Sequence, residues 1–152
     1  MDKKKLMRYT KTQLIDMLVK ENAVAVTTPN DALEPILNEL ETIKFQEVEC
    51  FVCITLNGCH KIIGTYVISK GLVNRTLVHA REVFRHAIAD NAIAIIIAHN
   101  HPSGDLTPSE DDKETTKRIK RAGDILGIKV LDHLIVSPSV QGYFSFLENR
   151  IF

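Results

Sequence analysis

An unbroken apolar run, Ile93-Ala94-Ile95-Ile96-Ile97-Ala98, stands directly before a polar loop in the second half of the chain. A strand that is buried on one face alternates apolar and polar residues, whereas a strand covered on both faces needs no polar positions. The run therefore predicts a central strand in a sheet that is covered on both sides. Such sheets carry helices in layers on their faces.

A helix is predicted after this strand and its loop, from about Pro108 to Leu126. Thr107 would be its N-cap, Pro108 its first helical residue, and Glu110 the partner that completes a capping box. Gly127 would end it.

The rest of the chain alternates between helix and strand patterns in the same way. The other predicted elements are helices at Thr10–Glu21, Asp31–Ile43 and His79–Asp90, a hairpin of strands Glu49–Leu56 and Lys61–Ser69 turning at Asn57-Gly58, a strand at Lys129–Val136 and a short element at Tyr143–Phe146. This order predicts an α/β layered domain with a mixed sheet flanked by helices. Residues 1–44 would be a short N-terminal helical extension, and residues 45–152 the domain that carries the chemistry.

Composition narrows the class of protein. The 152 residues have a formal net charge of +0, which gives no positive surplus for holding nucleic acid through its phosphates, although a local basic patch stays open. No apolar run is long enough to cross a membrane, and Met1–Arg8 lacks the apolar stretch of a signal peptide, so we expect a cytoplasmic protein without a membrane partner. The three cysteines fit a reducing compartment. Cys50 and Cys53 are three apart on a predicted strand, so their sulfurs should point to opposite faces.

Residues with metal-ligating side chains follow the apolar run. His99 and His101 are two apart in an extended segment, so both imidazoles should point the same way, at the strand end where open α/β sheets bind ligands. Asp112 lies near the start of the next helix, which can fold back toward them. Two imidazoles and one carboxylate suit zinc, and three protein ligands leave one position for water. The same sequence would also occur if the histidines were surface loop residues and Asp112 only interacted favourably with the helix dipole. The spacing alone therefore leaves both interpretations open.

The order of these residues resembles a metalloprotease motif. The pattern H-x-H-P, six residues, S, two residues, D is similar to the JAMM (MPN+/JAB) motif, with its positions at His99, His101, Pro102, Ser109 and Asp112. The segments Ala98–Asp105, His79–Phe84 and Leu131–Val136, together with Gly64-Thr65, resemble RadC-type JAB proteins more narrowly. The resemblance covers about Phe45 to the C-terminus. It implies the MPN fold, with zinc bound by His99, His101 and Asp112.

The resemblance also implies a hydrolytic mechanism. Zinc hydrolysis needs a general base to take a proton from the metal-bound water, and in JAMM proteins this base is a glutamate on an early strand. Glu47 and Glu49 are the candidates; Glu49 is favoured because it begins the apolar strand and stands where RadC-type sequences carry the matching residue. The family's motif serine, which assists the oxyanion, matches Ser109. Asp132 and His133 are adjacent on a predicted strand, so at most one can face the site, and we expect a structural role.

These inferences predict a zinc-dependent metallohydrolase of JAMM type that cleaves peptide or isopeptide bonds, with a protein or peptide as its substrate. Two alternatives stay open. One is a RadC-like protein associated with DNA repair, which the net charge of +0 does not support. The other is a zinc-binding module without turnover, against which the presence of Glu49 and Ser109 weighs. The sequence predicts neither the substrate's identity nor the oligomeric state.

Overall fold

The computed structural model of the protein describes residues 25–41, 48–71, 78–137 and 142–152. Its elements are α3 (Pro29–Glu41), β1 (Cys50–Leu56), β2 (Ile62–Lys70), α4 (Ala80–Ala89), β3 (Ala94–Asn100), α5 (Glu110–Leu126), β4 (Lys129–Val136) and β5 (Tyr143–Ser145). The predicted helix at Thr10–Glu21 lies outside the described residues. None of the helices within these ranges has the length and hydropathy needed to cross a bilayer.

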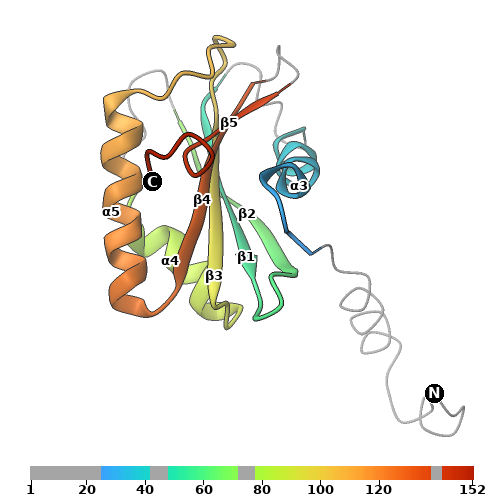
Figure 1. Ribbon diagram of the computed structural model, residues 1–152, viewed down its shortest axis with the longest axis vertical. Helices are drawn as coiled ribbons and strands as arrows, with labels where there is room; N and C mark the ends of the chain where they lie inside the picture. The colour runs from blue at the N-terminus through green and yellow to red at the C-terminus, as the bar shows by residue number, and fades with distance from the viewer. Residues whose placement is uncertain (1–24, 42–47, 72–77, 138–141) are drawn as a thin grey trace, which may run out of the picture.

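Five strands form one mixed sheet in the order β2-β1-β3-β4-β5 (Figure 1). β1 pairs antiparallel with both β2 and β3, β3 pairs parallel with β4, and β5 pairs antiparallel with β4. The parallel pair is joined through α5, as a parallel connection requires a long crossover. β3 lies in the middle of the sheet with every residue buried, which confirms the central strand predicted from the apolar run.

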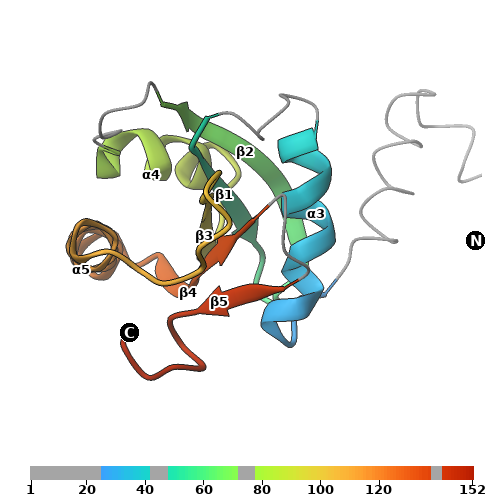
Figure 2. The same cartoon turned by 90° about the horizontal axis from the view of Figure 1, so that it is seen from above.

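Helices cover both faces of the sheet, α3 on one face and α4 with α5 on the other (Figure 2). Successive strand residues point to opposite faces, so β3 contributes to two cores. Ala94, Ile96 and Ala98 belong to the core under α3. Ile95 and Ile97 belong to the core under α4 and α5. The α/β fold with a mixed sheet is as predicted.

The cysteines also behave as their spacing predicts. Cys50 packs into the core on the α3 side and Cys53 into the core on the other side, so their sulfurs diverge. Cys50, Cys53 and Cys59 are all free cysteines. The C-x-x-C spacing therefore forms neither a disulfide nor a ligand pair.

The start of α5 differs from the prediction. Ser109, not Thr107, is the N-cap: its side chain accepts the N–H of Asp112 (3.1 Å), and the Asp112 carboxylate accepts the N–H of Ser109 (2.7 Å). The capping box thus closes on Asp112 rather than on Glu110. The reason is that the loop forms its own turn, in which Asp105 Oδ1 accepts the Thr107 N–H (2.8 Å), and the chain stays extended until Ser109. Gly127 ends the helix in a left-handed conformation, as predicted (φ 71°).

Smaller differences affect the ends of other elements by one or two residues. α3 begins at Pro29, two residues before the predicted start, because the Asp31 carboxylate accepts the backbone N–H groups of Thr27 (2.9 Å) and Thr28 (2.8 Å). The β1–β2 hairpin turns after Asn57 as predicted, but β2 begins at Ile62 rather than at Lys61.

Gly123 lets α5 pack directly on the segment that leads into β4. A Cβ at this position would lie 2.5 Å from the carbonyl oxygen of Ile128 and 3.1 Å from Cζ of Phe84. We expect Gly123→Ala to lower the free energy of unfolding. Overpacking should cost about 1–3 kcal/mol, and this cost should exceed the gain of about 1 kcal/mol that alanine brings to a free helix position. Chemical denaturation would measure the change. Asp124→Ala, at the exposed neighbouring position, is the control and should stay within about 0.5 kcal/mol of wild type. A Gly123→Ala protein at least as stable as wild type would show that the helix can move away.

Candidate metal centre

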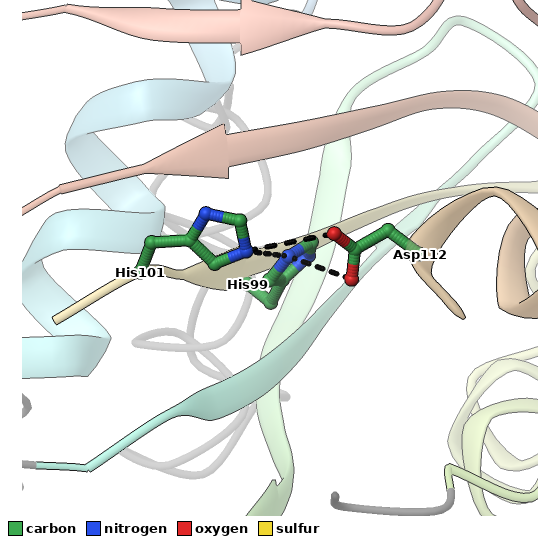
Figure 3. Close-up of side chains that lie close together, drawn as sticks. All are labelled: His99, His101 and Asp112. Atoms are coloured by element: carbon green, nitrogen blue, oxygen red, sulfur yellow. Dashed lines mark hydrogen bonds and ion pairs between the residues drawn. The ribbon is translucent and has the colours of Figure 1, made fainter. Parts of the chain in front are cut away.

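Three side chains that can bind a metal converge where β3 ends and α5 begins (Figure 3). His99 Nε2 lies 3.0 Å from His101 Nε2 and 3.2 Å from Asp112 Oδ1. His101 Nε2 lies 3.5 Å from Asp112 Oδ2. One ligand atom from each residue falls within 4.8 Å of the others. The structure therefore brings together His99, His101 and Asp112 in a group that could hold a metal ion.

The polypeptide fixes each of these residues locally. His99 is part of β3, and the backbone N–H of His101 donates to the carbonyl oxygen of Val136, which continues the pairing with β4 (2.9 Å). Gly104 adopts a positive φ of 88° that returns the loop toward the strand end, and His101 Nδ1 lies 2.6 Å from the carbonyl oxygen of Asp105. The capping box holds the carboxylate of Asp112. Strand, loop and helix start thus orient the group together.

The charges in this group are coupled. Burial acts to raise the pKa of Asp112, but its contacts with the imidazoles of His101 and His99 outweigh burial and hold that pKa well below its ordinary value. The same bond with Asp112 raises the pKa of His101. Asp112 is therefore an ionised carboxylate that favours a positive charge beside it, whether a proton on His101 or a metal cation.

A third histidine lies behind His99. His133 Nε2 is 2.8 Å from His99 Nδ1, and His133 Nδ1 is 2.6 Å from the hydroxyl of Thr116. Burial holds the pKa of His133 well below its ordinary value, so its imidazole is neutral. Asp132 points to the other side, where it accepts hydrogen bonds from Ser145 Oγ (2.6 Å) and the Leu147 N–H (3.0 Å). The prediction that at most one of this pair faces the site is confirmed, and His133 is that residue.

A pocket of about 280 Å³ opens beside the three ligand candidates. Glu49, which is exposed, and Ser109 both line it, so both sequence-predicted catalytic residues lie at this site. Glu47 lies outside the described residues. Ser69 also lines the pocket, and its buried hydroxyl has no hydrogen-bond partner within the part of the chain that the structure describes. No sequence pattern predicts a role for Ser69.

Asn100 fixes the backbone that carries Glu49. Its side-chain oxygen accepts the N–H of Cys50 (2.7 Å), and its amide nitrogen donates to the carbonyl oxygen of Val48 (3.0 Å). The carbonyl oxygen of Glu49 itself accepts the Gly71 N–H (2.8 Å). The buried side-chain amide of Asn100 therefore holds the residues on both sides of Glu49 at the end of β3. These bonds use backbone groups and do not involve the Glu49 side chain.

Comparisons with known proteins agree with this geometry. A family model described as a RadC-like JAB domain matches residues 26–151. A UPF0758 protein of Caldanaerobacter subterraneus subsp. tengcongensis is 45% identical over 128 residues, covering 80% of this chain and 54% of that protein. A UPF0758 protein of Clostridium perfringens strain 13 is 47% identical over 116 residues (76% and 50%), and one of Staphylococcus haemolyticus is 41% identical over 129 residues (85% and 54%). The chain spans about half the length of the curated relatives it matches.

Proposed function

Because the chain belongs to the RadC-like JAB domain family, we propose that it is a zinc-dependent metallohydrolase of JAMM type. The bond it cleaves is a peptide or isopeptide bond, and its substrate is a protein or peptide. The observation that carries the proposal is the convergence of His99, His101 and Asp112 beside a pocket that Glu49 and Ser109 also line. The free cysteines support a cytoplasmic setting.

The donor set and its spacing fit zinc. Ligand atoms bonded to a tetrahedral zinc ion at 2.0–2.2 Å lie about 3.3–3.6 Å from one another. The closest contacts here are 3.0, 3.2 and 3.5 Å, but the last two reach different oxygens of Asp112. One ligand atom from each residue lies within 4.8 Å of the others, so one Asp112 oxygen would have to move closer to both imidazoles to hold a single ion. A bound zinc would supply Lewis acidity and would lower the pKa of a water molecule at its open position to about 7.

The side chains in the pocket supply the other parts of a hydrolysis. Glu49 would take a proton from the attacking water as the water oxygen adds to the carbonyl carbon. Ser109 would donate its hydroxyl proton in a hydrogen bond to the oxygen on which negative charge develops. As the carbon–nitrogen bond breaks, Glu49 would return its proton to the leaving amine.

Ser109 can serve as helix cap and as donor together. Its oxygen accepts the Asp112 N–H, and this uses a lone pair and leaves the hydroxyl proton available. The proposed oxyanion role is thus compatible with the capping box.

We expect the protein to bind one zinc ion per chain and to lose hydrolysis when the ion is removed. Metal analysis of protein purified without added metal, followed by assay against a peptide and isopeptide library, would test this. A chelator should abolish cleavage and added zinc should restore it. The double variant His99→Ala/His101→Ala should bind no zinc; full occupancy in that variant would reject the ligand assignment. Zinc binding without cleavage of any substrate would favour a binding module instead.

A further inference from the structure

A chain of buried polar groups runs from His99 into the protein interior. His99 Nδ1 is 2.8 Å from His133 Nε2, His133 Nδ1 is 2.6 Å from Thr116 Oγ1, and Thr116 Oγ1 is 2.7 Å from the carbonyl oxygen of Asp112. His99, His133 and Thr116 are 1%, 0% and 3% exposed. At this burial each of these polar atoms depends on its neighbour in the chain for a hydrogen bond.

The last member of the chain fixes the direction of every hydrogen bond in it. The Asp112 carbonyl oxygen can only accept, so the Thr116 hydroxyl donates its single proton there. Thr116 Oγ1 must then accept from His133 Nδ1–H. A neutral imidazole that is protonated on Nδ1 has a lone pair on Nε2, so His133 accepts from His99 Nδ1–H.

The opposite direction is disfavoured. If Thr116 donated to His133, two buried oxygen atoms, Thr116 Oγ1 and the Asp112 carbonyl oxygen, would face each other at 2.7 Å with no proton between them. His99 would then accept on Nδ1 and carry its proton on Nε2, the nitrogen that faces His101 and Asp112. A protonated nitrogen cannot ligate a metal.

We propose that Thr116 and His133 are positioning residues that keep the proton of His99 on Nδ1 and so leave Nε2 free for the metal. The inference rests on the metal site of the proposed function and does not depend on hydrolysis. His101 also has a partner that keeps a proton on Nδ1, because its Nδ1 lies 2.6 Å from the carbonyl oxygen of Asp105, which can only accept. For His99 the acceptor is a third imidazole, and the hydroxyl of Thr116 sets the tautomer of that imidazole.

The neighbouring rings prevent His133 from finding another partner. It stacks on Phe146, with ring centroids 4.6 Å apart and planes 16° apart, and it makes an edge contact with Phe51, with ring centroids 5.6 Å apart. A valine at position 116 keeps the shape of threonine but removes the acceptor. The favoured state of Thr116→Val then has His133 protonated on Nε2, donating to His99 Nδ1, which places the His99 proton on Nε2. Loss of such an outer hydrogen bond typically weakens metal binding about 10–100-fold.

The test combines a tautomer measurement with a zinc affinity. Nitrogen NMR of the metal-free protein at alkaline pH distinguishes protonated from unprotonated ring nitrogens. We expect Nδ1 of His99 to be protonated in the wild type and in Thr116→Ser, and Nε2 to be protonated in Thr116→Val. In competition with a zinc chelator, Thr116→Val should bind zinc about 10–100-fold more weakly, and Thr116→Ser should bind close to wild type.

The possible results distinguish failure of the inference from failure of the proposed metal site. A wild-type protein with the proton on His99 Nε2 overturns the inference, and this measurement needs no variant to fold. A folded Thr116→Val protein with the wild-type tautomer and zinc affinity also overturns it. The expected tautomers in all three proteins, without zinc binding in any of them, would support the assigned proton direction and reject the metal site of the proposed function.

Discussion

Glu49→Gln should leave the zinc content unchanged and lower kcat by about 10²–10⁴-fold, the usual contribution of a general base. Glutamine has nearly the shape of glutamate but cannot take up the proton. The change should not disturb the fold, because the Glu49 side chain is exposed and its backbone is held by Asn100 and Gly71. Zinc analysis and steady-state kinetics on a cleaved peptide or isopeptide would measure both effects.

Glu47→Gln is the matched control, two residues earlier in the chain. It should keep wild-type turnover. If Glu47→Gln is inactive and Glu49→Gln is active, the base is Glu47. If both variants turn over normally, water activation by either of these two glutamates is the wrong mechanism.

The second large effect is expected at Ser109, where Ser109→Gly should lower kcat by about 10²–10³-fold and change KM only a few-fold. Loss of one oxyanion donor elsewhere has this size, and it acts on the transition state rather than on substrate binding. Because Ser109 is also the N-cap of α5, a plain alanine variant would mix catalysis with helix stability. Glycine is tolerated at an N-cap at a cost of a few tenths of a kcal/mol, whereas alanine costs about 1 kcal/mol.

Three variants separate the two roles of Ser109. Ser109→Gly and Ser109→Ala should lose similar turnover although they differ in stability, as judged by denaturant unfolding. Ser109→Thr keeps both the cap and the hydroxyl and should retain most activity. Turnover that instead follows stability, with Ser109→Gly near wild type, would limit Ser109 to its role at the helix start.

Patterns that repeat over a few residues made most of the fold predictable. The apolar run at residues 93–98 identifies the central strand because only a strand covered on both faces lacks polar positions. Gly127 identifies the end of α5 because a left-handed residue there favours glycine. The helix start was misplaced because Thr107 and Ser109 are both able to cap. The choice between them depends on Asp105, which takes the Thr107 N–H in the loop.

The site was predictable as far as it lies in one continuous segment. His99, His101 and Asp112 are close in sequence, so local geometry brings them together. Thr116 was missed, although it stands one helical turn after Asp112 on the same face of α5, because its role depends on His133 in another strand. Ser69 was missed because it reaches this pocket only through the pairing of β2 with β1, where it lies opposite Phe51, and Phe51 in turn lies opposite His99.

The double use of Asp112 restricts how the length of this segment can change. Inserting or deleting one residue between Ser109 and Asp112 would rotate the carboxylate by about 100° around α5 and would remove helix cap and ligand in one step. The length of the loop before Ser109 is restricted as well, because the carbonyl oxygen of Asp105 lies 2.6 Å from His101 Nδ1 and a change in loop length would break this contact. The segment from His99 to Asp112 therefore behaves as a unit of fixed length.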